Sequence, residues 1–403
     1  MAVLSEDLIS DAELLSAAKK CLFDRSRLLT PEATLAAIQD LKQWVGQEIA
    51  FEEGASASFG RIISELWHAE YLDQLPPLLN RFERLASAYF VRRGSVTAFQ
   101  GFCNAWRAGV LRRILQFAEE GHELDDQGHA PAPYALLAAG NLGRREQTLE
   151  DGDRYFLVWR EEALAEYFES YAYRVLAILD QYGLICREDA FLGKAVWRGS
   201  LEKWDGYLAG QSHLPGQYGV VETVADLRYI CGDEGIGLEA MRQATASLER
   251  CCSNDKLSSL AQGIVELPVA LGVFGDLRVE KKGEFAGCCN PEKFGLHPLI
   301  CSVRLLAAQY GLDPGSTLER LAALGALGVL QTAQVERFAA SYHVLAGLKV
   351  RREIALESPY FDPNSMPEQE RDSLKKALEA VRQLQRVVRC TFLGKKRSPR
   401  ENS

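Results

Sequence analysis

The stretch YALLAAGNLGRREQTLEDGDRYFLVWR, Tyr134 to Arg160, determines the fold that we expect for this chain. It opens with an apolar run, Tyr134–Ala139, and closes with a second one, Tyr155–Trp159, each as long as a typical β-strand. The segment Leu142–Leu149 between them is polar and made of residues that favour a short helix. We therefore expect two neighbouring strands, joined by a turn at Gly140 and a short helix.

Two aspartates stand directly before the second apolar run. Asp151 and Asp153 are two residues apart, and side chains at this spacing point to the same face of a strand. Both carboxylates would then be directed at one point at the mouth of the strand. Mg²⁺ is usually held by one or two carboxylates together with the phosphates of a substrate. The pair therefore predicts a magnesium site, although a D-x-D on its own also occurs in solvated turns.

The turn before the expected helix is suited to an anion. Gly140 allows the backbone to approach a ligand closely, and Asn141 can cap a short helix. The free N–H groups at a helix N-terminus favour negative charge, so we expect phosphates to bind here. Arg144 has two interpretations: it contacts a phosphate directly, or it pairs with Glu146 two residues later.

The order of these residues resembles a motif of the nucleotidyltransferase superfamily, in the branch of bacterial proteins related to the protein-PII uridylyltransferase. That motif reads roughly G-S-x-G-R-x-E-Q-T-L-x-T-D-Q-D-N. The matching residues here are Gly140, Gly143, Arg144, Glu146, Gln147, Thr148, Leu149, Asp151 and Asp153. The chain departs from the motif at Asn141, Glu150, Gly152 and Arg154.

Two later segments extend the resemblance. The segment VADLRYICGD, Val224 to Asp233, is similar to a second stretch of the family core and contains Asp226. Residues 293–324 resemble the helical region after that core, often described as a substrate-binding domain. The superfamily adds a third carboxylate that activates the attacking hydroxyl, and Asp226 and Asp189 are both candidates for it.

The resemblance implies Mg²⁺-dependent transfer of a nucleotide from UTP or ATP to a hydroxyl of an acceptor, for example a protein. Asp151 and Asp153 would hold the metal, while Gly140, Asn141, Gly143 and Arg144 would bind the nucleotide. The alternative is an inactive relative that serves as a regulatory or protein-binding module. Arg154 motivates this alternative, because a cation beside Asp153 competes with the metal.

Composition narrows the class of protein. The chain has 403 residues, of which 47% are hydrophobic and 25% charged, as in ordinary globular proteins. Its formal charge of −9 argues against general nucleic-acid binding, which requires a basic surface. We find no apolar run long enough for a membrane span and no signal peptide pattern. The ten cysteines contain no C-x-x-C pair, which favours free thiols in the cytoplasm over zinc.

The pattern predicts a mostly helical α/β protein with a small mixed sheet. We expect a helical region over residues 1–94, interrupted at Gly54–Gly60, and a nucleotidyltransferase-like domain over residues 95–233. A helical domain should follow over residues 234–392, ending in an amphipathic helix with Leu374 and Val388 on its apolar face. We expect residues 393–403 to form a disordered tail.

Overall fold

The computed structural model describes residues 31–124, 128–150, 154–184, 198–210, 220–251, 254–272, 275–312 and 315–394. It confirms the predicted class, because helices predominate and the strands of the described ranges form one small mixed sheet. Contacts divide the chain into two compact units, Met1–Tyr89 and Phe90–Ser403. Among the described helices, none combines the length and apolar character needed to cross a bilayer.

The first unit contains a helical hairpin in its described part. Its elements are α2 (Pro31–Trp67), the short helix η1 (Leu72–Gln74) and the first part of α3 (Leu75–Arg93). Phe51 stacks on Tyr89 and Phe59 contacts Phe82, so the two helices run antiparallel. The predicted interruption at Gly54–Gly60 is wrong: α2 continues through it, because the burial of Phe59 against α3 outweighs the low helix propensity of glycine.

A four-stranded sheet forms the centre of the second unit. The strands are β1 (Tyr134–Ala139), β2 (Arg154–Trp159), β3 (Arg198–Ser200) and β4 (Arg228–Gly232), in the order β3-β2-β1-β4. β1 pairs antiparallel with β2 and with β4, whereas β2 and β3 are parallel. Both predicted strands of the central motif are thus confirmed. The register places Ala139 opposite Arg154, next to the turn that follows β1.

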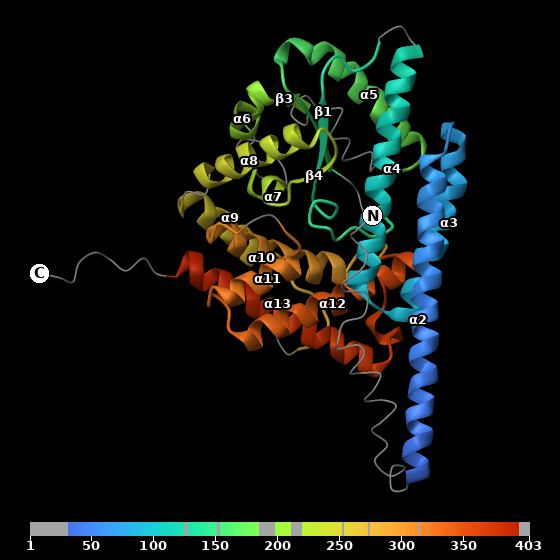
Figure 1. Cartoon of the computed structure of the whole chain (residues 1–403). Coiled ribbons are helices and arrows are strands. Elements are labelled where there is room, and N and C mark those ends of the chain that lie inside the picture. The colour runs from blue at the N-terminus through green and yellow to red at the C-terminus, as the bar shows by residue number, and fades with distance from the viewer. Residues whose placement is uncertain are drawn as a thin grey trace, which may run out of the picture. The chain divides into compact units, whose positions relative to one another are not determined.

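Helices cover both faces of the sheet (Figure 1). One face packs against α6 (Leu201–Gly210), α7 (Val220–Val224) and α8 (Glu234–Cys251). The other face packs against α5 (Ala165–Gln181), preceded by η2 (Glu162–Leu164), and β4 contacts α4 (Val96–Leu124). Trp159 stacks on Phe168 of α5, and Phe156 meets the edge of Trp204 in α6. The sheet is therefore buried between helices, and a ligand can approach it only at the ends of its strands.

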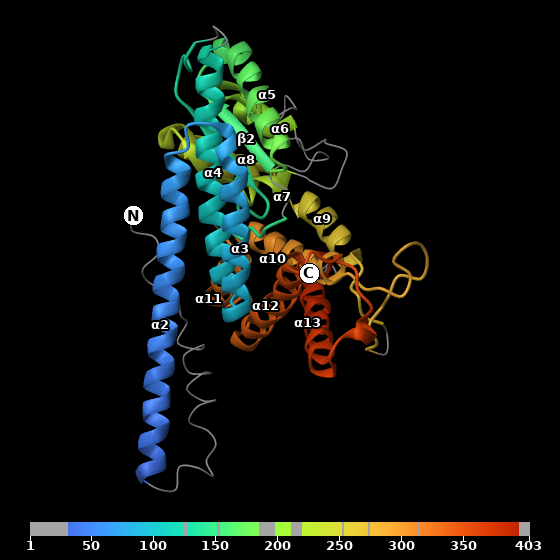
Figure 2. The same cartoon turned by 90° about the vertical axis from the view of Figure 1, so that its right-hand side faces the viewer.

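The C-terminal helices form one group beneath the sheet in both views (Figures 1 and 2). They are α9 (Asn254–Glu266), the π-helical turn η7 (Glu292–Leu296), α10 (His297–Gln309), α11 (Thr317–Ala326), α12 (Thr332–Ile354), η8 (Pro363–Ser365) and α13 (Glu368–Leu393). The amphipathic pattern of the last helix is confirmed, because Leu374 and Val388 are fully buried. Residues 90–403 form one unit by their contacts, and the domain boundary at 233–234 stays a prediction.

Candidate functional site

The turn after β1 is not the helix that we predicted. Gly140 has a φ of +75° and Arg145 a φ of +62°, which is the left-handed region that an α-helix does not contain. The turn closes through backbone hydrogen bonds from Arg144 to Gly140 and from Glu146 to Asn141. The turn therefore offers no helix N-terminus, and the side chains around it determine its chemistry.

Gly143 fits the turn against the segment before β4. A Cβ atom at this position would lie 1.9 Å from the backbone oxygen of Asp226 and 2.9 Å from that of Ala138. Only a residue without a side chain allows this approach. Gly143 thus allows these backbone segments to approach each other closely, while its predicted contact with a nucleotide stays a prediction.

Arg144 belongs to a buried ionic cluster. Its Nε lies 2.7 Å from Glu146 Oε2 and its Nη1 2.5 Å from Asp226 Oδ2, while Nη2 donates to Asn141 Oδ1. The side chain is 3% exposed. Of the two interpretations of Arg144, the structure shows the pairing with Glu146.

Two arginines from the C-terminal helices complete this cluster. Arg304 of α10 lies 2.7 Å from Asp226 Oδ2, and Arg320 of α11 lies 2.8 Å from Asp226 Oδ1. Glu146 also accepts a hydrogen bond from the backbone N–H of Thr317, at the start of α11. The sheet-containing part and the C-terminal helices therefore share one buried ionic network.

The electrostatics of Asp226 do not suit a general base. Burial alone would raise its pKa, but the guanidinium groups of Arg304, Arg144 and Arg320 outweigh burial and hold the pKa below its usual range. Such a carboxylate has a low affinity for a proton. The role that we expected for Asp226 as the activating carboxylate thus has no support in this geometry; the other candidate, Asp189, lies outside the described residues.

A second network joins the end of the motif to α12. Glu353 accepts hydrogen bonds from the Thr148 hydroxyl at 2.9 Å and from the Leu149 N–H at 3.2 Å. Lys349 donates to Thr148 and pairs with Glu353, each at 2.8 Å. All three side chains are buried, so α12 fixes the backbone just before the two aspartates in the sequence.

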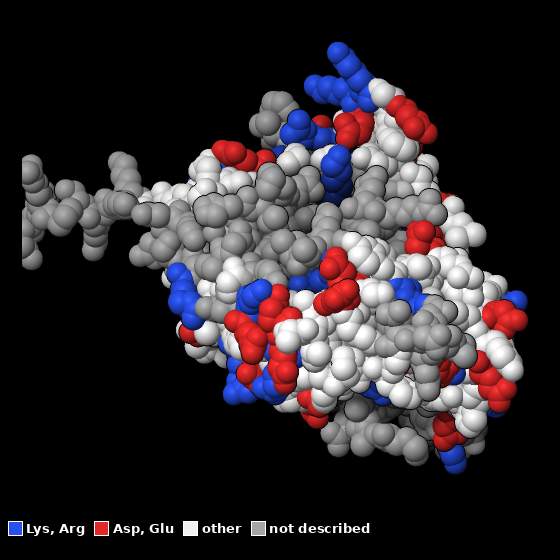
Figure 3. Space-filling model, turned by 90° about the horizontal axis from the view of Figure 1, so that it is seen from above, with Lys and Arg blue, Asp and Glu red and all other residues white. Residues whose placement is uncertain are grey.

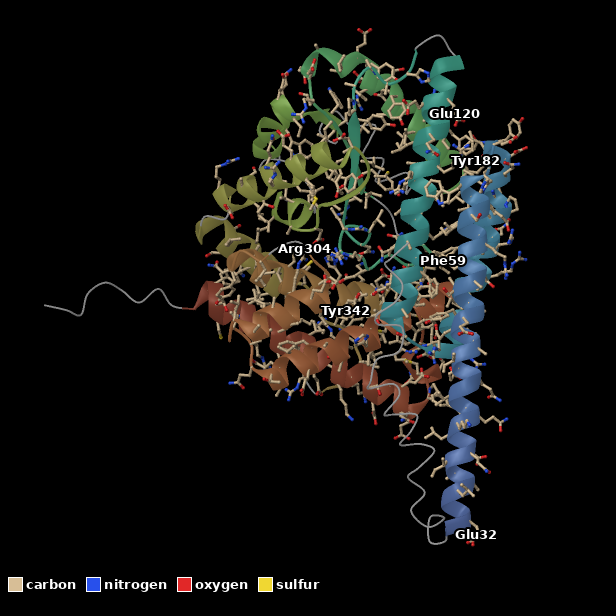
Figure 4. All side chains as sticks on the ribbon, in the orientation of Figure 1. Glu32, Phe59, Glu120, Tyr182, Arg304 and Tyr342 are labelled. Carbon is tan, nitrogen blue, oxygen red and sulfur yellow. The ribbon has the colours of Figure 1, made fainter. Side chains whose placement is uncertain are left out.

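A cavity of about 200 Å³ opens beside the Gly140 turn. Arg304 and Tyr342, labelled in Figure 4, come from two C-terminal helices and both line it. Its lining residues are Gln100, Gly140, Asn141, Arg144, Glu146, Thr148, Arg154, Glu292, Leu296, His297, Ile300, Arg304, Tyr342, Ala346 and Lys349. The predicted residues Gly140, Asn141 and Arg144 thus meet at one cavity.

A neighbouring cavity of about 280 Å³ shares Asn141, Glu292 and Lys349 with the first. It is also lined by Glu150, the residue before the D-x-D. Asp151 and Asp153 themselves lie outside the described residues.

The pKa of His297 reflects the positive charge around the first cavity. Burial, followed by the nearby charges of Arg304, Arg144 and Arg154, lowers its pKa to about 4. The imidazole is therefore neutral at pH 7 in a cationic surrounding. Sequence reasoning did not single out His297 or Lys349, because no local pattern shows that α10 and α12 pack against the Gly140 turn.

Comparison with protein families gives two matches. Residues 80–217 match the family described as "Putative nucleotidyltransferase DUF294". Residues 254–392 match the family described as "Putative nucleotidyltransferase substrate binding domain". No curated protein matches the chain. The two matched regions are the parts that meet at the cavity beside Gly140.

Proposed function

We propose that this nucleotidyltransferase-like protein binds a nucleoside triphosphate, UTP or ATP, in the cavity beside the Gly140 turn. It would transfer the nucleoside monophosphate group to a hydroxyl of an acceptor, as in the protein-PII uridylyltransferase that the motif resembles. One observation carries the proposal: residues of both matched regions line one cavity, and the motif residues Gly140 and Asn141 are among them. The family matches support nucleotidyl transfer in general.

The cavity offers complementary surfaces for the two parts of a nucleotide. Leu296, Ile300 and Ala346 supply an apolar wall suited to a base. Asn141 and Arg154 supply polar groups next to the turn, suited to phosphates. Because the oxygen of Asn141 accepts from Arg144, its amide N–H groups are the part that we assign to a phosphate oxygen.

Mg²⁺ is the cofactor that this reaction implies, and we assign its binding to Asp151 and Asp153. The donor set fits, since carboxylate oxygens are the ligands that this hard cation prefers. The described neighbours Glu150 and Arg154, on either side of these aspartates in the sequence, line the two adjacent cavities. When bound, the metal would neutralise the charge that develops as pyrophosphate leaves.

We assign Asp226 to positioning. By holding Arg144, Arg304 and Arg320 together, it would fix the turn that carries Asn141 against α10 and α11. The hydroxyl proton of the acceptor would then go to another base, for which Asp189 is the remaining sequence candidate.

A protein is the acceptor class that we favour. The description of the C-terminal family names substrate binding, and its helices form one side of the cavity. Nucleic acid is a poorer candidate. On the face drawn in Figure 3, acidic and basic side chains of the described residues are intermixed, without one continuous basic area.

A second candidate function is a regulatory module that has lost catalysis. It rests on Arg154, which stands where the related motif has asparagine and which lines the cavity directly after Asp153 in the sequence. A guanidinium at this position competes with a metal ion for the carboxylates. An assay of the wild type with Mg²⁺ and each nucleoside triphosphate separates the two functions: an active enzyme releases pyrophosphate, whereas an inactive relative releases none.

Calorimetric titration of UTP, ATP, CTP and GTP, with and without Mg²⁺, tests the proposal. We expect one nucleotide to bind more tightly with the metal, and expect this gain to vanish in the double variant Asp151→Asn/Asp153→Asn. Asp372→Asn, an exposed aspartate of α13, is the matched control and should bind as wild type. Failure of the folded wild type to bind any nucleotide would refute the proposed function.

A further inference from the structure

The cavity beside Gly140 collects arginines from different parts of the chain. Arg154 comes from the start of β2, Arg144 from the turn after β1, and Arg304 from α10. Glu146 and Glu292 are the carboxylates of its lining. Lys349 lines it as well but pairs with Glu353 and lies 3.6 Å from Glu292. Four cations and two carboxylates thus line the cavity, and two of the cations, Arg144 and Arg304, also pair with Asp226.

Arg154 reaches the turn where phosphates were expected to bind. It lies opposite Ala139 in the register of β1 and β2. Its Nη1 atom is 3.9 Å from the position that a Cβ atom on Gly140 would occupy. Gly140 has no side chain, so an anion can approach the turn and the guanidinium together.

His297 faces the same positive field from α10. His297 lines the cavity, and the charges of Arg304, Arg144 and Arg154 act on its imidazole. The ring contacts Cys301 Sγ at 3.6 Å, one turn further along α10. An anion among these groups would be stabilised, since their charges act in a partly buried, low-dielectric site.

We propose that Arg154, His297 and Arg304 form a subsite for the polyphosphate of the nucleotide, in place of the absent helix N-terminus. The subsite deepens the proposed function, on which it rests for the identity of the ligand. Direct contacts from side chains would hold the polyphosphate even without a divalent cation. Two of the three residues belong to the C-terminal helices, so that region binds the donor as well as any acceptor.

Inorganic tripolyphosphate tests the subsite, because it carries the phosphates without a nucleoside. Calorimetry in the presence of EDTA should show binding to wild type and at least tenfold weaker binding to Arg154→Gln. Arg160→Gln is the matched control, since Arg160 follows the other end of β2, is half exposed and pairs with Glu239. It should bind tripolyphosphate as wild type does.

The imidazole of His297 gives a second readout that locates the anion. With ¹³C-labelled histidine, its NMR signals are assigned by their loss in His297→Gln. Tripolyphosphate at the subsite should raise the pKa of His297 above about 4, because the anion offsets the arginines. Unchanged His297 signals on binding would overturn the subsite, as would equal affinities of wild type and Arg154→Gln.

Failure of this inference is distinguishable from failure of the proposed function. A nucleotide that binds only with Mg²⁺, and equally well to Arg154→Gln, would refute the subsite and leave the function standing. Binding of tripolyphosphate without binding of any nucleotide would support an anion site and refute the function. Titration of uridine or adenosine completes the test. Tight binding of the nucleoside alone would show that the base supplies the affinity and would refute the polyphosphate subsite.

Discussion

Arg144 Nη1 lies 2.5 Å from Asp226 Oδ2, and both side chains are almost completely buried, with 3% and 0% of their surface exposed. The two residues are 82 positions apart in the sequence, in the turn after β1 and in the segment before β4. Burial by itself lowers the pKa of Arg144, but the carboxylates of Asp226 and Glu146 outweigh it and raise the pKa. Both side chains are therefore charged at pH 7.

The first prediction concerns this pair. Arg144→Gln should lower the free energy of unfolding by about 3–5 kcal/mol, because it leaves buried carboxylates without their partner. Arg145→Gln is the control: Arg145 is half exposed and lies 3.5 Å from the half-exposed Glu319, so its loss should cost about 1 kcal/mol or less. Denaturant unfolding measures both variants. Equal costs would contradict a central role for the buried pair.

The second prediction concerns the close approach at Gly143. Gly143→Ala places a Cβ atom 1.9 Å from the Asp226 backbone oxygen, so the turn or the segment before β4 must move. We expect a loss of about 1–3 kcal/mol or more in the free energy of unfolding. Gly101→Ala is the matched control in α4, where a Cβ atom meets nothing within 4 Å. It should be neutral or stabilise the protein by up to about 1 kcal/mol.

The third prediction concerns the coupling of α12 to the motif. Glu353→Gln weakens the acceptor for the Leu149 N–H and the Thr148 hydroxyl. Hydrogen bonds to charged groups contribute about 1.5–3 kcal/mol, so the amide of Leu149 should exchange with deuterium about tenfold faster or more. Glu357→Gln is the control, since Glu357 is exposed and pairs with Arg352. Unchanged exchange at Leu149 in Glu353→Gln would show that α12 does not hold this segment.

The fourth prediction concerns the dependence of stability on pH. The pKa of His297 falls from 6.5 to about 4 on folding, so between these values the unfolded chain binds a proton that the folded chain does not. Stability should therefore be fully present above pH 6.5 and decrease as the pH falls towards 4, by up to about 1.4 kcal/mol per pH unit.

Burial contributes most to the low pKa of His297, followed by the charges of Arg304, Arg144 and Arg154. Lys349, Glu146 and Glu292 are the other charged residues that line the cavity. The free energy of unfolding of wild type minus that of His297→Gln, measured from pH 4.5 to 7, isolates the contribution of His297. If this difference did not change with pH, the predicted contribution of His297 to the pH dependence of stability would be contradicted.

Part of the fold was predictable because it depends on local patterns. The apolar runs of β1 and β2 are buried on both faces, so nearly every residue in them is apolar and the strands are visible in the sequence. The last helix was predictable because Leu374 and Val388 belong to a regular apolar stripe. The residues Gly140 and Asn141 were likewise found from a contiguous motif, and the structure brings them to one cavity.

The helix predicted over Leu142–Leu149 was wrong for a tertiary reason. Arg144 and Glu146 are good helix formers, but both have buried partners far away in the sequence, Asp226 and the backbone of Thr317. These contacts require a turn with Arg145 at positive φ. Helix propensities differ by less than about 1 kcal/mol per residue, which is small against a buried ionic network.

By itself, the sequence determined the strands of the central motif, the amphipathic last helix and the likeness to nucleotidyltransferases, because each depends on residues close together in the chain. Only the tertiary structure decided the ionic partners of Arg144 and Asp226 and brought His297 and Lys349 to the cavity. The physical reason is that charge and burial act between groups that are near in space. Arg304 and Arg320 come close to Asp226 only when α10 and α11 pack against the segment before β4.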